Sequence, residues 1–215
     1  MLFIVGSLLF AVGAFPPYSQ LVDGRAVGLT FVVGGLFFTA GGYSAFLEVI
    51  NDNREAGMPF RFWAWSPRTK LWWAAFIQLI GTLLFNVNTI DAMIATFNVE
   101  QTNRLVWGPD VFGSTAFLVA SHLFWANLRG ARRRGEIDDA DWWAALLNYL
   151  GSMFFLVSAI ASFTLETTGE AVNIALVNSG TFLGAGCFLV GSYLGLPPTD
   201  PDDRGGAAGG PPHPD

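Results

Sequence analysis

Five polar residues in or beside apolar stretches are the chain's best candidates for chemistry: Gln78, Asn88, Asp91, His122 and Asn148. The first three fall in one stretch and share a helical face. Polar groups inside a membrane are costly, so one interpretation is a polar path or a cation site. The other is hydrogen bonding between helices, which contributes about 0.6 kcal/mol per contact. We favour the second, because Gln78 and Asn148 hold matching places in two similar segments.

His122 is the only histidine within an apolar stretch. Imidazole titrates near neutral pH, so a role in proton handling or ligand binding is one interpretation. A polar ring that anchors a helix at the membrane interface is the interpretation we favour. No second histidine or cysteine stands at metal-ligand spacing, so we expect no metal site. Phosphate-binding loops, His-Glu-x-x-His and Gly-x-Ser-x-Gly sequences are absent, so we expect neither an enzyme nor a cofactor.

The composition shows which elements must position these residues. Of the 215 residues, 52% are hydrophobic and only 13% are charged, against about 25% charged in soluble domains. Apolar runs of about twenty residues are typical of membrane-spanning helices. We therefore predict an all-α polytopic membrane protein with six transmembrane helices, at 1–15, 25–48, 71–91, 109–127, 142–163 and 172–195. Prolines after the first and last helices end them, and Pro109 is predicted to begin the fourth.

The two ends of the chain differ from the rest. The first predicted helix has fifteen residues, which span about 22 Å and fall short of a hydrocarbon core of about 30 Å. We expect either that the start of the chain is truncated or that this helix is short and tilted neighbours cover it. Segment 197–215 is rich in Pro, Gly and Asp, and we expect a disordered cytoplasmic tail. Residues 1–196 then form one membrane domain.

The positive charges predict the orientation. Nine arginines and lysines lie in the loops around 54–70 and 129–134 and in the tail, against two, Arg25 and Arg104, on the opposite side. Positive residues stay on the cytoplasmic side, so both termini are expected to be cytoplasmic and the protein multi-pass in the cell (inner) membrane. Seven of the eight tryptophans fall near the same interface, as an aromatic belt would.

A three-residue pattern recurs in every predicted helix: Gly, then Phe four positions later, then in five of the six helices a small residue three further on. Spacings of four and seven place all three residues on one face, and such notched faces suit close helix packing in lipid. The six sets are Gly6, Phe10 and Gly13; Gly34, Phe38 and Gly41; Gly81, Phe85 and Asn88; Gly113, Phe117 and Ala120; Gly151, Phe155 and Ser158; Gly184, Phe188 and Gly191.

Flanking residues indicate that the pattern comes from duplication. Trp72-Trp73-Ala74-Ala75 stands before Gly81 at the spacing at which Trp142-Trp143-Ala144-Ala145 stands before Gly151. Chance in a chain rich in Gly and Phe is the alternative, but it does not explain matching flanks. We therefore predict three parallel two-helix hairpins, at 1–48, 71–128 and 142–196, about an axis along the membrane normal.

The third hairpin resembles a known family. Asn148, Gly151-Ser152 and Phe155, followed by Phe188 and Gly191-Ser192, are similar to the two-helix YrhK-like domain of small bacterial membrane proteins. The first and second hairpins match less well, because Asn86 and Asn88 interrupt an apolar run and Ala120-Ser121 replaces Gly-Ser. The resemblance implies a membrane hairpin and brings no functional residues to carry over.

Two classes of function stay open. The favoured one is a non-enzymatic structural or interaction protein, with membrane lipids and further copies of itself as partners. The alternative is a transporter or channel for a small solute or ion, which requires Gln78, Asn88 and Asn148 to meet in a wet cavity. Nucleic acid is not an expected partner, because the net charge is −6 and no binding module is present.

Overall fold

A computed structural model describes residues 1–52, 54, 57–133 and 139–196. Within these residues all regular structure is helical, apart from one isolated bridge between Thr164 and Ala171. The prediction of an all-α protein is therefore confirmed. In chain order the elements are α1 (Leu2–Ala14), α2 (Pro16–Leu21), α3 (Gly24–Asn51), α4 (Lys70–Asp91), α5 (Val99–Thr102), the π-helical segment η1 (Asn103–Trp107), α6 (Gly108–Arg133), α7 (Asp139–Ala161) and α8 (Ile174–Leu194).

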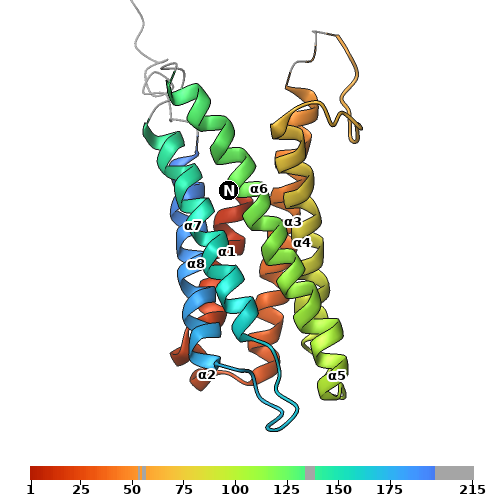
Figure 1. Cartoon of the computed structure of the whole chain (residues 1–215), viewed down its shortest axis with the longest axis vertical. Helices are drawn as coiled ribbons and strands as arrows, with labels where there is room; N and C mark the ends of the chain where they lie inside the picture. Colours follow the sequence, from red (N-terminus) through yellow and green to blue (C-terminus); the bar gives the residue numbers. More distant parts are fainter. Residues whose placement is uncertain (53, 55–56, 134–138, 197–215) are drawn as a thin grey trace, which may run out of the picture.

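The long helices stand side by side along the long axis of the molecule (Figure 1). Each packs on two neighbours, in the circular order α1, α3, α4, α6, α7, α8 and back to α1. Five are long and apolar enough to cross a membrane, with α5, η1 and α6 counted as one helix. These five helices indicate a membrane protein.

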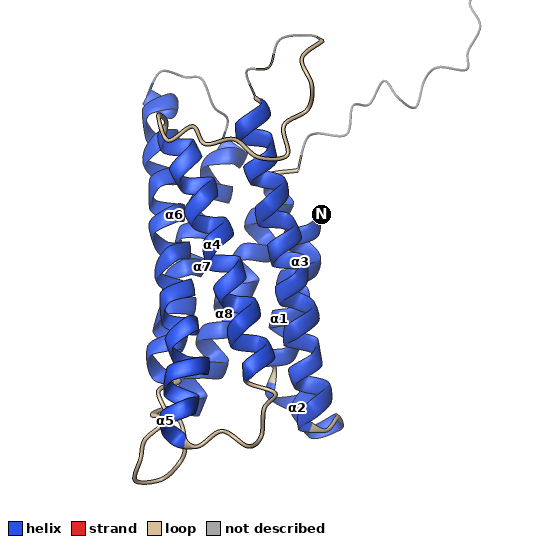
Figure 2. Ribbon diagram, turned by 90° about the vertical axis from the view of Figure 1, so that its right-hand side faces the viewer, coloured by secondary structure: helices blue, strands red, loops and turns tan. Residues whose placement is uncertain are grey.

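The sixth member of the ring, α1, is shorter than a membrane span. Its 13 residues cover about 20 Å. It ends at Ala14, because Phe15 is extended and Pro16 and Pro17 begin the separate helix α2. The N-terminus lies partway along the bundle, and α2 lies at the same end as α5 (Figure 2). Six full-length crossings are therefore not found among the described helices.

The predicted start of the fourth helix at Pro109 is wrong. The chain is already helical at Val99, where Asn98 and Gln101 form a reciprocal capping box. Pro109 lies inside this helix, where its ring would clash with the carbonyl four residues earlier. The turn before it widens into η1, and the Gly108 N–H donates to the carbonyl of Asn103, five residues back. A π-helical turn of this kind makes room for the proline.

The glycine and phenylalanine faces meet within three helix pairs. A Cβ built on Gly6 would lie 2.9 Å from the Phe38 ring, and one on Gly34 would lie 2.7 Å from the Phe10 ring. In the pair α7/α8, a Cβ on Gly151 would lie 2.7 Å from the Phe188 ring. In the pair α4/α6 the glycines leave slightly more room, because the nearest atoms to a Cβ built on Gly81 or Gly113 would be 3.2–3.3 Å away.

Replacing Gly151 with alanine is predicted to destabilise the protein. The new Cβ would meet the Phe188 ring at 2.7 Å and the Gly184 carbonyl at 2.9 Å, so α7 and α8 must move apart. Overpacking of this kind costs about 1–3 kcal/mol. Thermal unfolding in detergent should show a lower midpoint for Gly151→Ala. The matched control is Gly186→Ala on α8, where a Cβ meets no atom within 4 Å; equal midpoints for the two variants would contradict the prediction.

Candidate functional site

Six phenylalanine rings fill the centre of the helix ring. Those of α1, α4 and α7 form one triangle, with centroids 5.8–6.1 Å apart, and those of α3, α6 and α8 form a second, at 5.7–6.1 Å. The triangles are joined within each helix pair at 5.1–5.5 Å. We call this group the phenylalanine plug; its members are Phe10, Phe38, Phe85, Phe117, Phe155 and Phe188.

The plug is closed. None of its six side chains exposes more than 6% of its surface. The void among five of the rings measures about 10 Å³, which is at or below the volume a single water molecule requires. The plug therefore separates the space at one end of the bundle from the space at the other.

A cavity of about 220 Å³ lies on the side of the plug nearer α5. Its floor is the triangle of Phe10, Phe85 and Phe155, and Asp110 is the only charged residue among the residues that line it. We call it the Asp110 cavity. Its further polar lining comes from α4, α5, α7, the turn after α7, and α8. These residues are Asn88, Thr89, Thr102, Ser158, Ser162 and Thr181.

Asp110 accepts a hydrogen bond from the hydroxyl of Ser162, which directly follows α7, with Oγ and Oδ2 3.3 Å apart. No ion pair to Asp110 is found in the described part of the chain. The indole Nε1 of Trp107, also in the cavity wall, is buried without a hydrogen-bond partner. The cavity thus holds one carboxyl group without a positively charged partner and one unused N–H donor.

The π-helical segment fixes the position of these groups. Asn103 holds η1 against the α7–α8 loop, because its side chain donates to the Thr164 carbonyl at 2.8 Å and accepts from the Thr164 N–H at 2.9 Å. Asn88 of α4 donates to the carbonyl of Val106 at 3.0 Å. η1 is therefore tied on two sides immediately before Asp110. Widened turns of this type occur often at functional sites.

A second cavity, of about 650 Å³, lies at the other end of the bundle. Met1, Leu2 and Phe3 line it together with parts of α3, α6, α7 and α8, so we call it the Met1 cavity. Asn148 is among its lining residues, and its Oδ1 is buried with no partner in the described chain.

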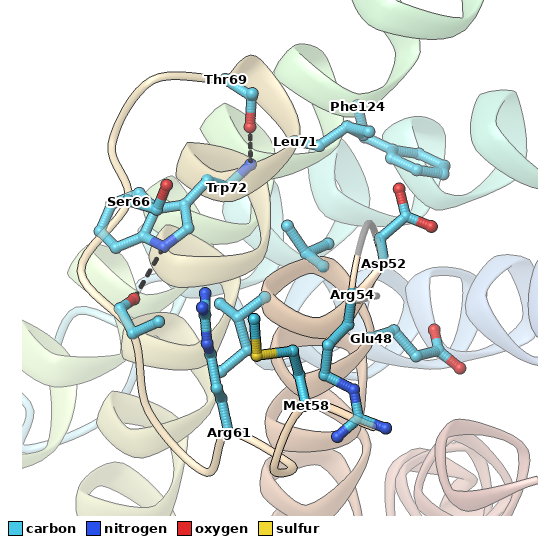
Figure 3. A pocket seen from close by; sticks show the side chains of 13 residues that line it. Glu48, Asp52, Arg54, Met58, Arg61, Ser66, Thr69, Leu71, Trp72 and Phe124 are labelled. Atoms are coloured by element: carbon cyan, nitrogen blue, oxygen red, sulfur yellow. Dashed lines mark hydrogen bonds between the residues drawn. The ribbon is translucent and has the colours of Figure 1, made fainter. Parts of the chain in front are cut away.

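A third pocket, of about 620 Å³, lies under the α3–α4 loop. Arg54 and Arg61 of the loop and Glu48 of α3 extend around it (Figure 3). The loop is held in place by Trp72, whose indole donates to the Ala64 carbonyl at 3.1 Å and whose backbone N–H donates to the Thr69 hydroxyl at 3.1 Å. Trp72 also lines the pocket, and it packs in a buried cluster with Phe46.

The five polar residues singled out in the sequence do not form one path. Asn88 lies in the Asp110 cavity and Asn148 in the Met1 cavity, on opposite sides of the plug. Gln78, Asp91 and His122 are not among the residues that line either cavity. His122 is exposed on the outside of the bundle, with its ring 5.8 Å from that of Tyr149.

The sequence patterns do not single out Asp110, because the neighbouring Pro109 indicates a helix start. A signal was present in the spacing. Asp110 stands three residues before Gly113, as Phe31 stands before Gly34 and Thr181 before Gly184. All three line the same cavity. A residue three before the glycine of α3, α6 or α8 therefore faces the bundle axis.

The ring of long apolar helices, closed by the plug, defines the class of the protein: an all-helical membrane protein with a buried acidic cavity. Comparison with protein-family profiles, with curated proteins and with solved structures found no match.

Replacing Asn103 with alanine is predicted to loosen the α7–α8 loop, because both hydrogen bonds to Thr164 are lost. Leaving such groups unpaired costs about 1–3 kcal/mol each. Hydrogen–deuterium exchange of peptides covering 162–173 should therefore speed up in Asn103→Ala. The neighbouring surface variant Arg104→Ala is the control and should exchange as the wild type does. Unchanged exchange in Asn103→Ala would show that these bonds do not hold the loop.

Proposed function

We propose that this chain is a non-enzymatic, multi-pass membrane protein that does not conduct solutes in the state described here. It crosses the membrane six times as three copies of one hairpin, 1–48, 71–128 and 142–196, with α1 as a short crossing. The support is the shared contact within the pairs α1/α3, α4/α6 and α7/α8, where a glycine of each helix faces the other helix's phenylalanine. The YrhK-like resemblance is part of this proposal and applies best to 142–196.

The observation that carries the proposal is the closed phenylalanine plug. A permanent path along the bundle axis needs water-filled space, and the rings leave a void of only about 10 Å³. Because Asn88 and Asn148 lie on opposite sides of the plug, the polar groups of the two halves do not meet. This arrangement favours a structural or interaction role.

The partners that fit this role are membrane lipids and further copies of the chain. Large apolar side chains such as Leu36, Leu83 and Ile160 are more than half exposed along the helices, as expected of surfaces that contact lipid. The glycine faces are already occupied within the chain. A homo-oligomer therefore has to use a different surface.

Transport of a small solute stays as the second candidate, because cavities lie on both sides of the plug. In that case the rings would have to separate to connect them. Reconstituted liposomes loaded with a pH-sensitive dye distinguish the two candidates. We predict that the wild type leaves an imposed proton or potassium gradient intact, because the axis is sealed.

The variant Phe117→Ala provides the matched test. It removes one ring of the plug and is predicted to increase leakage of the gradient at a stability cost of about 3–5 kcal/mol. Phe112→Ala, on the same helix but 69% exposed, should behave as the wild type does. Gradient dissipation by the wild type would favour the transporter instead, and a tight Phe117→Ala variant would show that the plug is not the barrier.

The proposed orientation, with both termini cytoplasmic in the cell membrane, is supported by the charge bias. The α3–α4 loop lies at the opposite end of the bundle from α5 (Figure 2). In a Cys187→Ala background, we predict that Ser66→Cys is protected from a membrane-impermeant maleimide in whole cells. Glu166→Cys, in the α7–α8 loop, should be labelled, because this loop faces the outside in the proposed orientation. Both positions are exposed on the protein, so a difference in labelling reports the compartment that each one faces. The reverse labelling pattern would invert the orientation.

A further inference from the structure

We propose that the Asp110 cavity is a binding site for a small organic cation, an amine with a compact apolar body. This goes beyond the proposed function and does not depend on whether the plug ever opens, because the cavity lies entirely on one side of it.

The charge of the ligand follows from Asp110. A carboxylate in an apolar site is costly unless it is paired with a positive charge or takes up a proton. In the described chain Asp110 has the Ser162 hydroxyl at 3.3 Å and no arginine or lysine within ion-pair distance. No other charged residue lines the cavity. An ammonium group on the ligand would supply the missing charge, and an anionic ligand would add a second negative charge.

The body of the ligand follows from the aromatic lining. Phe10, Phe85 and Phe155 form the floor, and Phe31 and Trp107 stand in the wall. Aromatic faces attract ammonium groups and pack well against apolar bodies. The buried Trp107 N–H, which has no partner, remains free to donate to an acceptor on the ligand or to a water molecule beside it.

The volume limits the size of the ligand. A cavity of 220 Å³ equals the share of about seven water molecules in the liquid, and it is smaller than typical drug-sized pockets of about 300–1,000 Å³. Nucleotides and oligosaccharides are therefore excluded. A bare metal ion fits poorly, because it needs several oxygen ligands at once and no cluster of three metal-binding side chains occurs in the described chain.

The position of Asp110 also distinguishes the site from ordinary helix packing. The equivalent places in the other two helix pairs, three residues before the glycine, hold Phe31 and Thr181. Three similar positions thus meet around one axis, and only one of them carries a charge. An aromatic ring, a hydroxyl and a carboxylate around one space form an asymmetric set, which suits a ligand with one charged end.

Calorimetric titration of the full-length protein in nanodiscs tests the proposal. The lipid is zwitterionic, so that headgroups do not attract amines, and empty nanodiscs are subtracted. The probe is 2-phenylethylammonium, with neutral 2-phenylethanol and sodium chloride as comparison ligands. We expect one saturable site for the ammonium probe and binding at least about tenfold weaker for the alcohol. Equal binding of the alcohol, or a response to sodium alone, would overturn the proposal.

Two variants locate the site. Asp110→Asn keeps an acceptor for Ser162 and should weaken binding of the ammonium probe at least about tenfold, whereas the control Asp91→Asn, outside the cavity lining, should bind as the wild type does. If Asp110→Asn does not fold, Ala92→Phe provides a second test. Ala92 is exposed and lines the cavity. A larger side chain there should block the entry of the probe while Asp110 stays intact. Wild-type affinity in either folded variant would refute the assignment.

Discussion

Close contact between a glycine on one helix and a phenylalanine on its partner is the constraint on which the rest of the structure depends. In a membrane, an apolar side chain gains little free energy when it moves from contact with lipid to contact with another helix. Helices therefore associate mainly through tight van der Waals packing. A glycine allows the neighbouring backbone and ring to approach. A Cβ built on Gly6, for example, would lie only 2.9 Å from the Phe38 ring. Repeated in three pairs, this contact turns six rings toward one axis and creates both the plug and the cavities beside it.

Much of the helical architecture could be predicted from the sequence, because hydropathy and the Gly-x-x-x-Phe spacing are local signals. These signals located the five long helices and the shorter α1, together with the residues that pack, and Phe10 and Phe38 do meet. The fourth helix was placed wrongly because Pro109 normally begins a helix. Its true start has a local signal too, the Asn98–Gln101 capping box, but the π-helical turn that accommodates the proline has no comparable sequence signature.

The site was less predictable, because a cavity depends on what several helices leave unfilled. Asn88 and Asn148 were marked as polar residues in apolar helices, yet nothing in the sequence says that a layer of rings separates them. His122 shows the converse problem: its spacing fits a helix, but its exposure depends on the neighbours that surround that helix. Asp110 was hidden by its place beside a proline, although its distance from Gly113 matched positions that face the axis in two other helices.

The place of Asp110 and Phe117 on one helix has a consequence for how the Asp110 cavity and the phenylalanine plug can move. Asp110 and Phe117 are seven residues apart on α6, two turns along the same face and about 10 Å apart. A twist of α6 about its own axis therefore swings the carboxylate and the plug ring through the same angle. A contact that stops α6 from rotating at the cavity therefore also stops it from rotating at the plug.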